Sequence, residues 1–150
     1  MAAIHIQTPI RAPARQVWQA LAATGDAHRA FAGVLTDCRL EREDLRVATF
    51  ANGMVVKERI VSVEPERMRI AYGVIESQFV HHSASMQVVA RGDDECDFIW
   101  IADVLPHGAA ASITPLMEQG ARALQAVMEK KSSQAKAHCC PVKNRTESVG

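Results

Sequence analysis

The chain has 150 residues, 48% of them hydrophobic, and its 17 Lys and Arg residues balance 17 Asp and Glu residues. A domain of this length buries about two-thirds of its unfolded surface, and a net charge of zero supplies no positive field to attract nucleic acid. The N-terminus has no basic stretch followed by an apolar run, and no apolar segment approaches the roughly 20 residues that span a bilayer, so we expect one cytoplasmic domain without a membrane span.

The first part of the chain predicts one strand and two short helices. Apolar and polar side chains alternate over residues 4–8, which is typical of a strand. Pro13 then stands where the first turn of a helix tolerates proline, and helical spacing relates three apolar residues, Val17, Trp18 and Leu21. Residues 24–26 (Thr-Gly-Asp) can end that helix, and we expect a second short helix through His28 and Phe31.

From Val34 to Val104 the apolar residues recur with a period of two, which predicts a meander of about six strands. Turn-forming residues divide this region at four places: Glu43-Asp44, Asn52-Gly53, Glu64-Pro65-Glu66 and Gly92-Asp93-Asp94.

A long helix is expected after the meander, opened by Thr114-Pro115. Its apolar residues form one stripe that should lie on the sheet: Ile113, Leu116, Met117, Gly120, Leu124, Val127 and Met128. Gly120 lies in the middle of this stripe, so we expect a gap between helix and sheet there. Residues 132–150 lose periodicity and apolar content, and we interpret them as a disordered tail after a domain of residues 1–131.

Alternation within each strand predicts which side chains face the helix. Three strands have one clearly more apolar set: Met68, Ile70, Tyr72 and Val74; His82, Ala84, Met86 and Val88; Cys96, Phe98, Trp100, Ala102 and Val104. For residues 54–62 both sets are mixed, so hydrophobicity does not decide the face on which Glu58 lies. A curved sheet, a long helix and a glycine between them predict a mostly apolar cavity, the usual form of a small-molecule site.

The order of these elements resembles the helix-grip (SRPBCC/START-like) superfamily, which includes START lipid-transfer domains, the birch-pollen allergen type and bacterial polyketide cyclase/dehydratase-like proteins. Several strings are similar to the family's pattern over about residues 4–131: IRAPARQVWQAL at 10–21, CRLE at 38–41, LRVATFANG at 45–53, VVKERI at 55–60, RIAYGV at 69–74 and FIWIADV at 98–104. The resemblance implies an α+β fold, with a curved antiparallel sheet of six to seven strands around the C-terminal helix and two short helices after the first strand.

The chain departs from the family's pattern in two places. Phe31-Ala32-Gly33 stands where bacterial members often have Trp-His-Pro-Gly-like residues, and His81-His82 stands where many members have Asn-Tyr. The register that the resemblance implies would bring Arg46, Glu58, Tyr72 and His82 together in the pocket. A buried Glu58 then needs Arg46 or His82 as a partner, because an unpaired buried carboxylate is very costly.

Three functions remain open at this stage. The first is binding or carriage of a small hydrophobic or amphipathic ligand, such as a lipid, isoprenoid or polyketide, by a set of nine residues: Arg46, Glu58, Tyr72, His82, Met86, Phe98, Trp100, Gly120 and Leu124. The second is a cyclase/dehydratase-type enzyme with His82 as the general base and Glu58 orienting it. The third is an adaptor that binds a protein partner through the tail or the outer sheet face.

No cofactor or metal is expected. Adjacent strand residues such as His81 and His82 point to opposite faces, and the cysteine spacing matches no zinc framework. Ile99 and Ile101 belong to the outer set of their strand and make that face a candidate homodimer contact.

Overall fold

Seven strands form one antiparallel sheet in the order β1-β7-β6-β5-β4-β3-β2 in the computed structural model, which describes residues 2–138. The strand bounds are β1 Ala2–Ile10, β2 Leu35–Arg42, β3 Leu45–Phe50, β4 Val55–Glu64, β5 Arg69–Ile75, β6 His81–Ala90 and β7 Cys96–Leu105. The helices are α1 Ala14–Ala22, α2 Ala27–Ala30 and α3 Ala110–His138, with short 3-10 turns at Thr24–Asp26 and His107–Ala109. The predicted α+β helix-grip fold is thereby confirmed, including the six-strand meander from β2 to β7.

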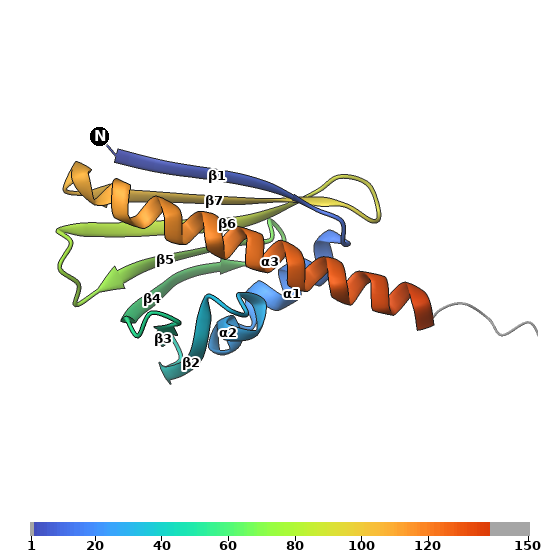
Figure 1. Ribbon diagram of the computed structural model, residues 1–150, viewed down its shortest axis with the longest axis horizontal. Helices are drawn as coiled ribbons and strands as arrows, with labels where there is room; N and C mark the ends of the chain where they lie inside the picture. The colour runs from blue at the N-terminus through green and yellow to red at the C-terminus, as the bar shows by residue number, and fades with distance from the viewer. Residues whose placement is uncertain (1, 139–150) are drawn as a thin grey trace, which may run out of the picture.

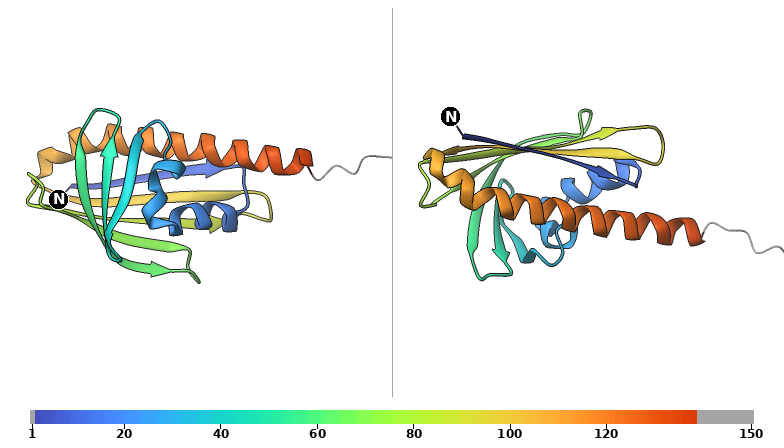
Figure 2. Two further views of the ribbon diagram at one scale, coloured as in Figure 1. Left: turned by 90° about the horizontal axis from the view of Figure 1, so that it is seen from below. Right: turned by 45° about the horizontal axis from the view of Figure 1, so that its top comes forward.

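The sheet is strongly curved around α3. In Figure 2 the strands β2, β3 and β4 run across the direction of β1, β6 and β7, so the sheet curls over one side of the long helix. Figure 1 shows α3 crossing the concave face along the length of β1, β6 and β7, with α1 and α2 beside β2 and below the middle of the helix. Two hairpin turns of the meander use a glycine with positive φ, Gly53 at 88° and Gly92 at 77°, where other residues would be strained.

Helix α3 begins four residues before the expected cap at Thr114. Three alanines, Ala109 to Ala111, favour this earlier start because alanine has the highest helix propensity. Pro115 therefore lies within the second turn, where it cannot donate to the carbonyl group of Ala111. Ala111 and Pro115 are both exposed, so water can satisfy that carbonyl.

The helix also continues beyond the expected boundary at Lys131 and ends at His138. Residues 132–138 contain Ala, Gln and Lys, which have good helix propensities, and Ser132 is buried. The expected disorder therefore does not extend to residues 132–138, and residues 139–150, including Cys139 and Cys140, lie outside the described part of the chain.

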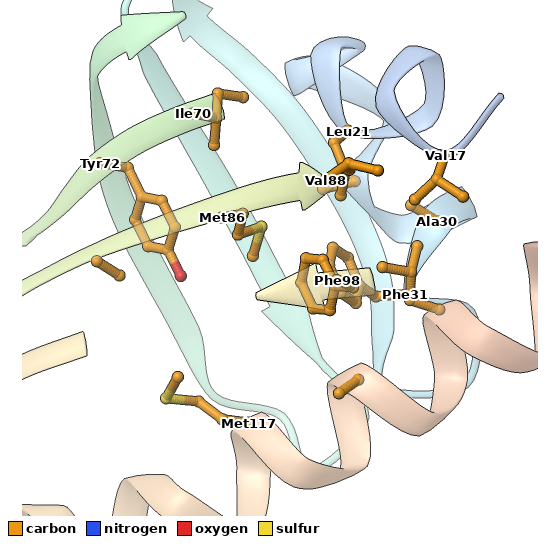
Figure 3. Packing of buried hydrophobic residues seen from close by; sticks show 14 of the residues in the cluster. Val17, Leu21, Ala30, Phe31, Ile70, Tyr72, Met86, Val88, Phe98 and Met117 are labelled. Carbon is orange, nitrogen blue, oxygen red and sulfur yellow. The ribbon is translucent and has the colours of Figure 1, made fainter. Parts of the chain in front are cut away.

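The core lies between the concave face and α3, and Figure 3 shows its packing around Phe98, Val88 and Met86. The predicted inward sets of β5, β6 and β7 point into this core or into the cavity beside it. On β4 the inward set contains Val56, Glu58 and Ile60, and a β-bulge after Ile60 leaves Val61 70% exposed. Ile99 and Ile101 are half-buried on β7, and the homodimer contact considered for their face stays a prediction.

Candidate ligand cavity

A cavity of about 620 Å³ lies between the concave face of the sheet and the N-terminal half of α3. The sheet contributes Tyr72, Met86 and Trp100, and the helix contributes Ile113, Met117 and Gly120. The β3–β4 turn and the loop between β5 and β6 complete the wall at one end, where Met54 and Val55 are exposed. Most of the wall is apolar, and its charged and polar groups lie on β3, β4, β5 and β6, on the β5–β6 loop and, with Ser112, on α3.

The glycine in the helix stripe does not leave a gap. A Cβ atom built on Gly120 would lie 2.9 Å from Trp100 Cζ3, so the indole ring fills the space that a side chain would need. The same ring contacts Phe31 and Phe98, with centroid distances of 5.6 and 5.8 Å. The expectation of empty space at Gly120 is therefore wrong, and Trp100 instead forms an aromatic wall of the cavity.

Two of the nine predicted ligand-binding residues lie outside the cavity wall. Phe98 and Leu124 are each 0% exposed and belong to the core. Phe98 is the next inward-facing residue after Trp100 on β7, and Leu124 lies one helical turn after Gly120 on α3. The large Trp100 ring against Gly120 ends the cavity before it reaches them. The other seven residues all line it: Arg46, Glu58, Tyr72, His82, Met86, Trp100 and Gly120.

Arg46 and Glu58 form a buried ion pair in the cavity wall. They stand directly opposite each other on β3 and β4, and Arg46 Nε donates to Glu58 Oε1 at 3.2 Å. Arg46 Nη1 donates to the carbonyl oxygen of Thr24 at 3.4 Å, which links the pair to the segment before α2. Burial is the largest single influence on Arg46 and opposes its charge, but Glu58, together with Tyr72 and Cys38, raises the pKa of Arg46 above its ordinary value. The arginine therefore stays charged and paired.

Tyr72 lies beside this pair on β5. Its hydroxyl oxygen accepts a hydrogen bond from Trp100 Nε1 at 3.1 Å, and the guanidinium carbon of Arg46 lies 5.2 Å from the centre of its ring. Burial, reinforced by the negative charge of Glu58, raises the pKa of Tyr72 well above its ordinary value. The phenol is therefore neutral at physiological pH.

His82 also lines the cavity, with the edge of its ring near Phe79 at a centroid distance of 6.2 Å. Burial lowers the pKa of His82, although the nearby negative charge of Glu58 opposes this shift. No hydrogen bond joins His82 to Glu58 within residues 2–138, and Glu58 is instead bonded through Oε1 to Arg46. His81 is exposed and its Nε2 lies 3.1 Å from Ser83 Oγ, so the two histidines do not share a site.

Several cavity residues were not predicted from the sequence. They come from the β3–β4 hairpin and from the segment that runs from the end of β5 into the β5–β6 loop: Phe50, Met54, Val55, Val56, Ile75 and Phe79. One signal was available, since Phe79 is an aromatic residue in the otherwise polar run Glu-Ser-Gln-Phe of residues 76–79. The turn residues carried no such signal because their approach to α3 depends on the curvature of the sheet.

The described residues 2–138 contain no group of three or more His, Cys, Asp or Glu side chains arranged to hold a metal ion. In the same part of the chain, every helix is too short or too polar to cross a bilayer.

Comparison with solved structures finds the same fold in several proteins. XoxI from Bacillus cereus is 16% identical with a TM-score of 0.76, and the match covers 85% of this chain and 96% of that one. A START superfamily protein from Mycobacterium smegmatis is 13% identical with a TM-score of 0.69, covering 90% and 99% of the two chains. Norcoclaurine synthase from Thalictrum flavum, solved with dopamine and hydroxybenzaldehyde, is 18% identical with a TM-score of 0.64, covering 93% and 88%.

A comparison with curated proteins finds no match. The sequence matches one family over residues 1–129, a span that includes every strand of the sheet and most of α3. The chain therefore belongs to the family described as polyketide cyclase / dehydrase and lipid transport.

Proposed function

We propose that this protein binds a small, uncharged and largely apolar molecule in the cavity between the sheet and α3. The observation that carries the proposal is the cavity of about 620 Å³, whose apolar wall contains one group of buried polar side chains. That volume falls within the roughly 300–1,000 Å³ of small-molecule sites, which combine apolar walls with a few polar groups. A lipid, isoprenoid or polyketide-like molecule has this character.

The charges in the wall support an uncharged ligand. Arg46 and Glu58 neutralise each other, and Tyr72 is neutral. At the rim, Lys57 pairs with Glu76 at 3.2 Å. A charged ligand would lose its hydration on entering the cavity and would find no unpaired charge of opposite sign there. The free-energy cost of its desolvation would therefore not be offset.

Native mass spectrometry of the protein purified from its own host tests for a co-purifying small molecule. Binding of the neutral fluorescent probe N-phenyl-1-naphthylamine tests the cavity directly. Leu116→Trp adds bulk to the cavity wall on α3 and should weaken probe binding at least tenfold. Val61→Trp places the same side chain at an exposed position outside this cavity and is the matched control. The absence of any bound molecule, together with no probe binding by the unsubstituted protein, would disprove the proposal.

A catalytic role is the second candidate, favoured by the half-buried His82 in the cavity wall. Its lowered pKa keeps the imidazole neutral at physiological pH, which suits a general base. Glu58 would then act through its charge, since it is hydrogen-bonded to Arg46. If His82→Gln abolishes turnover of an aromatic or polyketide-like substrate while binding persists, the protein is an enzyme of the cyclase/dehydratase kind. Turnover retained by this variant would exclude His82 as the base.

A role as a protein adaptor remains the third candidate. If the apolar probe does not bind and the protein elutes with a partner or as a dimer, the adaptor hypothesis replaces the ligand-binding one. Light scattering of the purified protein measures its oligomeric state directly.

A further inference from the structure

The hydroxyl group of Tyr72 has a hydrogen-bond partner for its oxygen but none for its hydrogen among residues 2–138. Its oxygen accepts from Trp100 Nε1 at 3.1 Å, so the indole occupies one side of the oxygen. The hydroxyl hydrogen must then point to another side, and no acceptor for it exists among the side chains and carbonyl groups of residues 2–138. Figure 3 shows the Tyr72 hydroxyl directed from the sheet toward α3, on the side where Met117 stands.

The neighbouring Arg46 offers further hydrogen-bond donors on the same side of the cavity. Arg46 carries five N–H groups, of which one bonds Glu58 and one bonds the carbonyl of Thr24. The other N–H groups have no acceptor within residues 2–138, and Arg46 lines the cavity. The Tyr72 hydroxyl and Arg46 therefore both favour a ligand oxygen that accepts a hydrogen bond at this wall.

We infer that Tyr72 selects the ligand, and that the end of the ligand at this wall carries an uncharged carbonyl oxygen. This inference rests on the proposed function and specifies its ligand class. In an empty cavity a water molecule can accept from Tyr72, so a ligand that displaces this water must supply an acceptor or leave a buried donor unsatisfied. An apolar ligand without an oxygen therefore binds more weakly than a ligand of the same shape that carries an acceptor.

Trp100 is a positioning residue in this arrangement. Its N–H bond to Tyr72 directs the phenol hydrogen away from the indole, and its ring is held between Gly120, Phe31 and Phe98. The guanidinium over the face of the Tyr72 ring withdraws electron density and strengthens the hydroxyl as a donor. A carboxylate ligand is disfavoured because Glu58 already pairs with Arg46.

The test compares two probes of nearly equal shape, 2-acetylnaphthalene and 2-ethylnaphthalene, which differ by a carbonyl oxygen. The unsubstituted protein should prefer the ketone, and Tyr72→Phe should reduce the ratio of the two dissociation constants by about three- to tenfold, the effect of one hydrogen bond. Trp100→Phe should reduce the same ratio by a smaller factor. A purely structural role would weaken both probes equally and leave the ratio unchanged. A third probe, 2-naphthoate, should bind more weakly than the ketone.

A second measurement needs no variant. The infrared carbonyl stretch of bound 2-acetylnaphthalene should lie below its frequency in hexane, because a hydrogen bond weakens the C=O bond. A stretch at the hexane frequency, an unchanged ratio in Tyr72→Phe or tighter binding of 2-naphthoate would each overturn the inference and leave the proposed function standing. Failure of all three probes to bind, while N-phenyl-1-naphthylamine still binds, would also overturn the inference alone. Failure of N-phenyl-1-naphthylamine as well would overturn the proposed function, and the inference with it.

Discussion

The indole ring of Trp100 on β7 packs directly against the backbone of Gly120 on α3. The indole ring lies where the side chain of residue 120 would project, and a Cβ atom there would be 2.9 Å from Trp100 Cζ3 and 3.3 Å from Cη2. The helix can approach the sheet closely at this point because residue 120 has no side chain. This contact sets the end of the cavity and holds the indole N–H toward Tyr72.

Gly120→Ala should therefore destabilise the protein although alanine is the better helix former. The helix propensity gain is about 1 kcal/mol, whereas overpacking costs about 1–3 kcal/mol, so the free energy of unfolding should fall by about 1 kcal/mol. The Trp100 ring cannot move freely because Phe31 and Phe98 flank it. Urea unfolding measures the change. Gly108→Ala is the control, since a Cβ there meets nothing within 4 Å, and equal stability of both variants would contradict the packing argument.

The Arg46–Glu58 pair should show strong coupling in a double-mutant cycle. Arg46→Met or Glu58→Gln alone leaves a buried group without its partner and should cost about 3 kcal/mol of unfolding free energy. The double variant should cost less than the sum of the two, because it buries no unpaired charge. The exposed pair Arg29–Asp26, at 3.9 Å, is the control, and Arg29→Met should cost less than about 1 kcal/mol. Additive effects at residues 46 and 58 would show that the buried pair does not act as a unit.

Tyr72 is the sole tyrosine of the sequence, so the near-ultraviolet absorbance of phenolate reports its ionisation directly. Because burial raises the pKa of Tyr72, the folded protein should show no phenolate near the ordinary pKa of about 10, whereas the urea-unfolded chain should titrate there. The unfolded state then loses its proton first, so the contribution of Tyr72 to stability is complete below about pH 10 and declines as the pH rises. Phenolate in the folded protein near pH 10 would mean that water reaches the hydroxyl freely.

His82 should make the protein less stable in acid. Because burial lowers the pKa of His82 below 6.5, the unfolded chain takes up this proton more readily than the folded protein. The stability contribution is complete above that value and is lost as the pH falls below it. Urea unfolding between neutral pH and about pH 5 should show a shallower pH dependence in His82→Gln than in the exposed-residue control His5→Gln. Identical dependences would remove His82 as a source of the effect.

The local sequence pattern was sufficient to predict the helices and strands and, for most strands, which side chains face α3. Alternation assigned Tyr72, Met86 and Trp100 to the concave face because successive strand residues point to opposite sides, a property of the backbone alone. It failed on β4, where Glu58 lies inward, because both sets of that strand mix apolar and charged residues. The pairing of Glu58 with Arg46 on the neighbouring strand resolves the question, and that pairing depends on strand register.

The extent of the cavity could not be derived from any single segment. Gly120 in an apolar stripe is compatible with empty space or with close packing, and the indole of a residue 20 positions earlier in the sequence decides for close packing. Likewise, the contact of the β3–β4 turn and Phe79 with the cavity follows from how far the sheet curls over α3. The chain's periodicity thus specifies which side chains can face inward, whereas volume and polar contacts arise from distances between elements remote in sequence, which no local pattern encodes.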